Sequence, residues 1–389
     1  MRTILYVGKG GVGKTTVAAA TGLAIADGGR RALVMSTDRA HSLGDALDRD
    51  LGREPEAVAE GLDAVEVDVH WELERNWGEV RQYLRSLFTA TGARRIVAEQ
   101  VAVLPGIEEL LGLLRLQEFA TEGEYDVVVV DCAPTGATLR LLSLPEVAEW
   151  YMRKFFKIER AAVRTMKPLA DRVFPVPLPE DGVYATIERL YGALEGLRTL
   201  LSDSATTTLR PVTLPEQMAI RETRRLYGSV LLYDLCVDAV VVNRVYPREA
   251  GDDFSRGIRR QQEARLQEIE EAFAPLPIAH LQRLPQEAVG MVILRQLAEA
   301  LAAQLEPAEV LVEGSPVQVR ERDGAYVMTM AMPFAERDDV DLLQDGDELV
   351  VQVGGIRRNL VLPPVLADRE VQRAEMREGR LCIQFGGDE

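Results

Sequence analysis

Short runs of consecutive apolar residues, many of them β-branched, recur through the N-terminal part of the chain. The clearest runs occupy residues 3–7, 31–37, 125–131, 237–243 and 276–281. Uninterrupted apolar runs of this length are typical of strands buried on both faces of a parallel sheet. Segments with helical spacing alternate with them, beginning at residues 14–27. The pattern therefore predicts an α/β fold in which helices cover both faces of a parallel sheet.

Two regions, about 71–122 and 145–201, are longer than a crossover helix needs and carry the apolar spacing of helices. We interpret them as helical insertions that form a subdomain. The second region mixes aromatic and basic residues around Trp150 and contains a stripe of leucines at Leu190, Leu194, Leu197 and Leu201. Such a stripe indicates either ordinary core packing or a hydrophobic groove for a client, and both interpretations stay open.

The pattern changes after Pro307, where short strand-like runs are separated by Asp and Gly. These runs are residues 316–321, 326–333, 348–353, 357–362 and 380–385. The dipeptides Asp323-Gly324 and Asp345-Gly346 are typical of hairpin turns. The sequence predicts two domains, an α/β domain over residues 1–305 and a small all-β sandwich over residues 315–386.

Composition and charge exclude several classes of protein. The 389 residues are 47% hydrophobic and 28% charged, which is typical of a globular chain with more than one domain. A net charge of −17 would repel a phosphate backbone, so we expect no nucleic-acid partner. The chain begins directly with a strand and has no long uncharged segment, which favours a cytoplasmic protein with at most peripheral membrane contact.

The cysteines do not form a recognisable site. Cys132, Cys236 and Cys382 are far apart in the sequence and make no CxxC pair or Cys/His cluster. A disulfide framework and a zinc site both need such spacing. We expect neither, and no zinc.

The strongest chemical signal is GKGGVGKT at residues 8–15, which matches the phosphate-binding pattern GxxxxGK[ST] between a strand and a helix. Glycines let the backbone approach the phosphates, whose charge the N–H groups and the helix N-terminus bind. Lys14 would contact the β and γ phosphates, and the Thr15 hydroxyl would ligate Mg²⁺. We therefore expect ATP and Mg²⁺ as cofactors, bound by Gly8, Lys9, Gly10, Gly11, Val12, Gly13, Lys14, Thr15 and Thr16.

Two carboxylates stand directly after predicted strands. Asp38 would orient or deprotonate the water that attacks the γ phosphate. Asp131 ends the run at residues 125–131, where a carboxylate holds the Mg²⁺ shell, often through water. His41 is interpreted as a locally hydrogen-bonded loop residue. Residues 132–145 are either a nucleotide-sensing switch or a capped turn, and their position after Asp131 favours the switch.

The segments KGGVGKTT, STDRAHSLGDAL and DCAPTGATLRLLSLP together resemble the arsenite-pump (ArsA) ATPase family, over roughly residues 1–305. That family includes the guided-entry targeting factor for tail-anchored membrane proteins. The resemblance places Lys9 in the deviant Walker A class, where it reaches the nucleotide of a partner subunit, so it implies a homodimer. It also implies that Asp38 positions water and that Asp131 is the magnesium-side carboxylate.

Two further nucleotide contacts are implied by the same resemblance. Asn243 in VVVNRV would lie near the adenine, and Glu216 in VTLPEQMAIRETRRL would be an acidic contact. Asn243 could instead cap the next element, and Glu216 could be a helix-start charge.

The departures from the family are informative. The arsenite pump has two ATPase halves and metalloid-binding cysteines, and the targeting factor has a zinc-binding CxxC; this sequence shows none of these features. Residues 315–386 resemble the α-crystallin domain of small heat-shock proteins in their short strands and closing EMREGRLCIQF. A generic β-domain is the alternative for this part.

The sequence favours a homodimeric ATPase switch with Lys9, Lys14 and Asp38 in catalytic roles. Its expected partner is a hydrophobic client, either a membrane-protein segment or a lipid-like ligand. The alternatives are a MinD-like spatial or partition ATPase, a metalloid-handling ATPase without the usual cysteines, and a nonhydrolysing chaperone built on the C-terminal β-domain.

Overall fold

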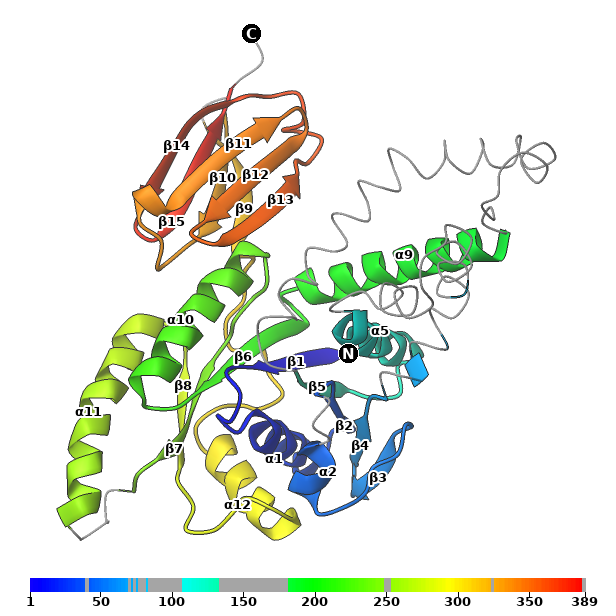
Figure 1. Cartoon of the computed structure of the whole chain (residues 1–389), viewed down its shortest axis with the longest axis vertical. Helices are drawn as coiled ribbons and strands as arrows, with labels where there is room; N and C mark the ends of the chain where they lie inside the picture. Colours follow the sequence, from blue (N-terminus) through cyan, green and yellow to red (C-terminus); the bar gives the residue numbers. More distant parts are fainter. Residues whose placement is uncertain are drawn as a thin grey trace, which may run out of the picture.

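The computed structural model of the chain describes residues 1–38, 42–68, 71–72, 75, 82, 107–132, 181–247, 253–322 and 325–386. In these ranges a large, mostly parallel sheet with helices is followed by a separate antiparallel β region (Figure 1). This arrangement confirms the predicted fold class, α/β followed by a β-sandwich. The predicted insertions lie largely outside the described residues, which contain α5 (Ile107–Glu122), α9 (Asp181–Ser202) and residues 71–72, 75 and 82.

The large sheet has eight strands in the order β3-β4-β2-β5-β1-β6-β7-β8. All of its pairings are parallel except that of β3 with β4. The carboxyl ends of the parallel strands therefore meet at one edge. The strands are β1 (Arg2–Val7), β2 (Ala32–Ser36), β3 (Glu56–Ala59), β4 (Leu62–Glu66), β5 (Val127–Asp131), β6 (Thr207–Thr213), β7 (Val240–Val245) and β8 (Ile278–Gln282).

Successive residues of the central strands face two different hydrophobic cores. In β1, Leu5 and Val7 belong to one core, and Ile4 and Tyr6 belong to the other. The first core holds residues of α5, α9, α10 (Gln217–Leu232) and α11 (Asp253–Phe273), and the second holds residues of α1 (Lys14–Asp27), α2 (Ser42–Leu47) and α12 (Met291–Ala302). Burial on both faces explains why these strands are continuously apolar.

The leucine stripe of α9 forms part of the first core. Leu194, Leu197 and Leu201 are buried there together with Leu113, Leu116 and Phe119 of α5. α5 and α9 are far apart in the sequence but pack against each other beside the sheet (Figure 1). Ordinary core packing is therefore the interpretation that holds for these three leucines.

The strand β6 is absent from the predicted set, although all of its residues are buried. Its sequence TTLRPVT contains Arg210 and Pro211, which argue against a central strand. Arg210 is fully buried because Asp238 accepts two hydrogen bonds from its guanidinium, both 3.0 Å long. The ion pair is a tertiary contact, so the local sequence pattern could not predict that Arg210 is buried in a strand.

Asp238 is the centre of a buried charge cluster that holds the segment after α12. It also pairs with Arg2 of β1 at 3.0 Å and accepts the backbone N–H of Leu311 at 3.2 Å. Arg210 donates to the carbonyl of Pro307 at 2.8 Å. Burial lowers the pKa of Arg2 to about 10. The cluster fixes the path of residues 307–311 beside the large sheet.

The C-terminal region is a sandwich of a four-stranded sheet, β14-β15-β10-β9, and a three-stranded sheet, β11-β12-β13. Met328, Leu349, Leu360 and Ile383 belong to its shared core. The predicted Asp345-Gly346 turn joins β11 to β12, with Gly346 at φ 60°, whereas Asp323-Gly324 lies outside the described residues. The strands are β9 (Val317–Arg322), β10 (Ala325–Ala331), β11 (Val340–Asp345), β12 (Glu348–Val353), β13 (Ile356–Val361), β14 (Val371–Arg377) and β15 (Arg380–Phe385).

The sandwich packs on the C-terminal end of α10 (Figure 1). Phe334 meets the rings of Tyr227 and Phe273 edge-on, with centroids 5.8 and 6.1 Å away. The guanidinium of Arg224 lies 4.6 Å from the Phe334 centroid. Asp234, just beyond α10, accepts a 2.6 Å hydrogen bond from Ser315. α10 is therefore shared by the large sheet and the sandwich.

Candidate functional site

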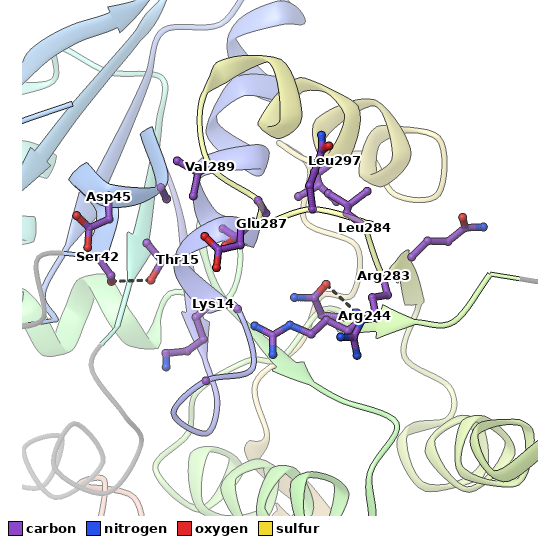
Figure 2. A pocket seen from close by; sticks show the side chains of 18 of the residues that line it. Lys14, Thr15, Ser42, Asp45, Arg244, Arg283, Leu284, Glu287, Val289 and Leu297 are labelled. Atoms are coloured by element: carbon purple, nitrogen blue, oxygen red, sulfur yellow. Dashed lines mark hydrogen bonds between the residues drawn. The ribbon is translucent and has the colours of Figure 1, made fainter. Parts of the chain in front are cut away.

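A cavity of about 850 Å³ opens at the carboxyl ends of the parallel strands, beside the glycine-rich loop of residues 8–15, here termed the P-loop. Figure 2 shows side chains from several elements around this space. The lining comes from the P-loop and α1, from the segment after β2 and from α2, from the end of β7, from the segment after β8 and from α12. Its described residues are Gly10, Gly11, Gly13, Lys14, Thr15, Thr16, Asp38, Ser42, Asp45, Ala46, Asn243, Arg244, Gln282, Arg283, Leu284, Pro285, Gln286, Glu287, Ala288, Val289 and Leu297.

Two P-loop glycines are required by close contacts as well as by backbone conformation. Gly8 has φ 152°, and a Cβ there would lie 2.4 Å from the carbonyl oxygen of Val212. Gly13 has φ 92°, and a Cβ there would lie 2.3 Å from Nδ2 of Asn243. Both positions exclude a side chain. The loop can therefore pass close to β6 and β7.

Lys14 begins α1 and lines the cavity from a buried position, since the residue is 6% exposed. Its ammonium group donates a 3.4 Å hydrogen bond to the carbonyl of Lys9. A buried lysine beside a helix N-terminus makes this end of the cavity electropositive. Phosphate is the ligand group that fits such an environment.

Asp131 lies at the end of β5, in register with Tyr6 of β1 and Ser36 of β2. Its Oδ2 accepts hydrogen bonds from the hydroxyls of Thr15 at 2.7 Å and Ser36 at 3.2 Å. Burial raises the pKa of Asp131 to about 6, although the Thr15 hydroxyl and the Lys14 charge oppose the shift. A neighbouring cation would favour the ionised carboxylate and reverse this shift.

The oxygen atoms around Thr15 fit a magnesium ion. Oδ1 of Asp131 is buried and makes no hydrogen bond to any residue that the structure describes. The hydroxyl of Ser42 lies 2.9 Å from that of Thr15. Mg²⁺ prefers hard oxygen ligands and keeps several of its waters. An unpartnered carboxylate oxygen beside two hydroxyls can bind such an ion directly or through water.

Asp38 lies after β2 and lines the same cavity. Its side chain is half-buried, and its backbone N–H donates to the hydroxyl of Ser36 at 3.3 Å. The charge of Asp38 also contributes to the raised pKa of Asp131. The two carboxylates predicted from the sequence are thus brought to one edge of the sheet.

Two of the predicted site residues, Lys9 and Glu216, lie outside the lining of the cavity. Neither is among the described residues that line the cavity. The Lys9 side chain is 38% exposed, and its ammonium lies 3.9 Å from the carboxylate of Glu222 on α10. Glu216 is the exposed N-cap residue of α10, with φ −132° and ψ 138°. This position matches the helix-start alternative for Glu216.

Asn243 lines the cavity and also makes local hydrogen bonds. Its Nδ2 donates to the carbonyl of Val12 at 2.9 Å, and its Oδ1 accepts from the N–H of Arg244 at 2.8 Å. These two bonds fix the orientation of the amide. The remaining N–H and lone pair of Asn243 are available for a ligand.

Several lining residues were not predicted from the sequence, including Ser42, Asp45, Arg244 and residues 282–289. Residues 282–289 begin at the end of β8, a predicted parallel strand. The rule that ligands bind beyond the carboxyl ends of parallel strands applies to this segment as well. This rule could have identified residues 282–289 as part of the site.

The cysteines in the large-sheet region are poor soft ligands. Burial raises the pKa of Cys132 to about 12 and that of Cys236 to about 11, so both thiols are protonated at neutral pH. Among the described residues, no three His, Cys, Asp or Glu side chains gather as a metal-binding group. The predicted switch segment after Asp131 lies outside the described residues beyond Cys132.

None of the helices in the described ranges is both long and apolar enough to cross a membrane.

Comparison with known proteins gives two family matches. The model of the anion-transporting ATPase family matches residues 1–303. The model of the HSP20-like domain found in ArsA matches residues 323–385. The second match agrees with the predicted α-crystallin-like character of the C-terminal sandwich.

Two of the similar proteins cover nearly the whole chain. A putative arsenical pump-driving ATPase 1 from Aquifex aeolicus is 36% identical over 393 residues, which covers 98% of this chain and 99% of the relative. A putative arsenical pump-driving ATPase from Chlorobaculum tepidum is 36% identical, with coverage of 99% and 96%. The ATPase get3 from Botryotinia fuckeliana is 27% identical over 79% of this chain and 91% of its own length.

Proposed function

The chain belongs to the anion-transporting ATPase family, and on this premise we propose that it is a cytoplasmic, homodimeric switch that binds a hydrophobic client in an ATP-dependent way. ATP hydrolysis is the reaction of the family. The observation that carries the proposal is the placement of two lysines of one loop in different environments.

Within one subunit, the P-loop N–H groups and Lys14 would hold the triphosphate. Thr15 and Asp131 would hold Mg²⁺, which neutralises phosphate charge when bound. Asp38 would orient the attacking water, because it lines the cavity on the side of Asp131. Asn243 would contact the nucleotide near the adenine, and Glu216 would be an acidic nucleotide contact, as the family resemblance implies.

The Lys9 side chain is 38% exposed and pairs with Glu222, whereas Lys14 is buried in the cavity. A lysine that does not line its own cavity can still neutralise the phosphates of a second subunit placed against the loop. The deviant Walker A resemblance implies this role for Lys9. Two subunits related by a twofold axis would then exchange Lys9 symmetrically.

The test compares Lys9→Ala with Lys14→Ala. Lys9→Ala should retain Mg·ATP binding within about threefold but lose ATP hydrolysis by about 100-fold or more, as removal of a trans-acting cation does. Lys14→Ala should lose binding itself. Light scattering with a nonhydrolysable ATP analogue should show a dimer for the parent and a monomer for Lys9→Ala.

A second experiment distinguishes a trans-acting role of Lys9 from a general disturbance of the P-loop. In a mixture of Lys9→Ala and Asp38→Asn subunits, each variant lacks a different group, so heterodimers regain one complete site if Lys9 acts in trans. No recovery of hydrolysis in the mixture, together with an ATP-bound monomer for the parent, would remove the basis for the dimer.

The client part of the proposal rests on the family resemblance and on the two predicted helical insertions, to which α5 and α9 belong. The family resemblance implies a membrane-protein segment or a lipid-like ligand. Purification in ATP analogue and in ADP, followed by native mass spectrometry, should show a bound apolar molecule in one state only. Equal occupancy in both states would contradict coupling, because a ligand shifts an equilibrium only through different affinities. Sedimentation with liposomes but no retained client would favour the MinD-like alternative.

A further inference from the structure

Arg244 follows Asn243 at the end of β7, and its backbone is unusual. It has φ 55°, in the left-handed region that residues other than glycine rarely occupy. The pairing of β7 with β8 shifts register between Val242 and Val245, as in a β-bulge. Such bulges redirect a side chain and are common beside functional sites. The conformation is held by the 2.8 Å hydrogen bond from the N–H of Arg244 to the side chain of Asn243.

The bulge directs Arg244 to the cavity. In β7 the residues from Val240 to Asn243 are buried, whereas Arg244 is exposed and lines the cavity. No residue in the described ranges accepts a hydrogen bond or an ion pair from its guanidinium. The neighbouring Arg283 differs, because its guanidinium lies 5.2 Å from the centroid of the Tyr246 ring. Arg244 is therefore the arginine available to a ligand at this end.

The two ends of the cavity have different chemistry. Figure 2 shows Thr15, Ser42 and Asp45 on one side, and Arg244, Leu284 and Leu297 on the other. The first side contains the oxygen atoms suited to Mg²⁺ and the terminal phosphates. A nucleotide is longer than its phosphate chain, so its base would extend to the second side. That side offers leucine side chains and the guanidinium groups of Arg244 and Arg283, of which only Arg283 lies over a protein ring, that of Tyr246.

We propose that Arg244 recognises the nucleotide base by stacking its guanidinium on the ring face, and that the strained bulge exists to place it there. The proposal rests on the proposed function, since it requires that the cavity bind ATP. Guanidinium groups stack on aromatic rings and combine dispersion with cation–π attraction. Leu284 and Leu297 would provide apolar contacts on the same side.

The experiment measures binding of Mg²⁺ complexes of ATP, ribose 5-triphosphate and tripolyphosphate to the full chain by calorimetry. Arg244→Gly should weaken ATP binding about tenfold, by the size of a lost base stack. Ribose 5-triphosphate and tripolyphosphate should bind as they do to the parent. The same variant should not lower Tm, because glycine adopts φ 55° without strain.

Two matched variants test whether the loss of ATP affinity comes from the planar guanidinium group, from its charge or from the backbone conformation. Arg244→Lys keeps the charge and the left-handed backbone but loses the planar group, so its ATP affinity should also fall several-fold. Glu378→Gly changes another exposed residue with positive φ, 48°, in the turn between β14 and β15. It should leave ATP affinity unchanged and again not lower Tm.

Three results would overturn the assignment of Arg244 to the base. One is an ATP affinity of Arg244→Gly equal to that of a parent that binds ATP. Another is an equal loss for tripolyphosphate or ribose 5-triphosphate, which would assign Arg244 to phosphate or sugar. A third is full ATP affinity in Arg244→Lys. A parent protein that fails to bind ATP would instead refute the proposed function.

Discussion

Asp131 is a carboxylate at the end of a fully buried strand, and burial raises its pKa from 3.8 to about 6. Between these values the folded protein holds a proton that the unfolded chain has lost. The stabilisation from the neutral carboxyl group is complete at low pH and is lost as the pH rises through about 6. At neutral pH the nucleotide-free protein therefore contains a destabilising charge that a bound cation would compensate.

Replacement of Asp131 by asparagine tests whether this buried charge destabilises the nucleotide-free protein. Without nucleotide and Mg²⁺, the stability of Asp131→Asn relative to the parent should be about 1.5 kcal/mol more favourable at pH 8 than at pH 5. Urea denaturation at both pH values measures the difference. Asp131→Asn should also lose Mg-dependent ATP hydrolysis.

Asp45→Asn is the matched control, because Asp45 is an exposed carboxylate in the same cavity. This control measures how much the loss of an exposed carboxylate in the cavity changes the free energy of unfolding at each pH. An Asp131→Asn difference that is equal at pH 5 and pH 8 would show that the buried charge does not destabilise the fold.

At the scale of elements, α1 is positioned by a glycine in its middle. A Cβ at Gly22 would lie 2.2 Å from Cγ2 of Val34 on β2 and 3.0 Å from Cδ1 of Leu62 on β4. Both neighbours are buried core side chains. The helix that follows the P-loop can therefore approach the sheet closely only without a side chain at this position.

Gly22→Ala should destabilise the protein by about 2 kcal/mol, because overpacking outweighs the better helix propensity of alanine. Gly228 of α10 is the matched control, since a Cβ there would meet nothing within 4 Å. Gly228→Ala should stabilise the protein by about 0.5–1 kcal/mol. Denaturation midpoints of the two variants measure the opposite signs, and two shifts of the same sign would contradict the packing argument.

At the scale of the whole molecule, α10 lies between the P-loop and the C-terminal sandwich. Its Glu222 pairs with Lys9 of the P-loop, and its Tyr227 contacts Phe334. Arg358 of the sandwich donates to the carbonyl of Leu232, the last residue of α10. One helix therefore contacts both the loop with the proposed trans-acting lysine and the α-crystallin-like sandwich.

Phe334→Ala should loosen the sandwich from α10 and α11, with a loss of about 2–3 kcal/mol of packing free energy. We expect faster limited proteolysis near residues 303–316 and, in calorimetry, two separate unfolding transitions. Leu343→Ala on β11 is the control, because Leu343 is 62% exposed. Equal cleavage rates for the parent and Phe334→Ala would show that this aromatic contact does not hold the sandwich in place.

Local pattern predicted much of the fold correctly. Helix α1 has the predicted limits, and β12 and β15 agree residue for residue with the predicted runs. These elements have strong local signals, either a P-loop before a helix or hydrophobic alternation between turns. The strands β3, β4, β6, β11 and β14 were not predicted, because they are short or contain charged residues and proline whose partners are distant in the sequence.

The sequence by itself determined the class of chemistry. A phosphate loop is contiguous, so Lys14 and Thr15 are placed by covalent neighbours, and a carboxylate after a buried strand is placed by the strand. The tertiary structure decided which distant residues share the site. Arg244, Ser42 and residues 282–289 meet the P-loop only because the strand order β2-β5-β1-β6-β7-β8 brings their strand ends to one edge. Local periodicity predicts which residues are buried but not the order of the strands, since that order depends on packing between elements far apart in the chain.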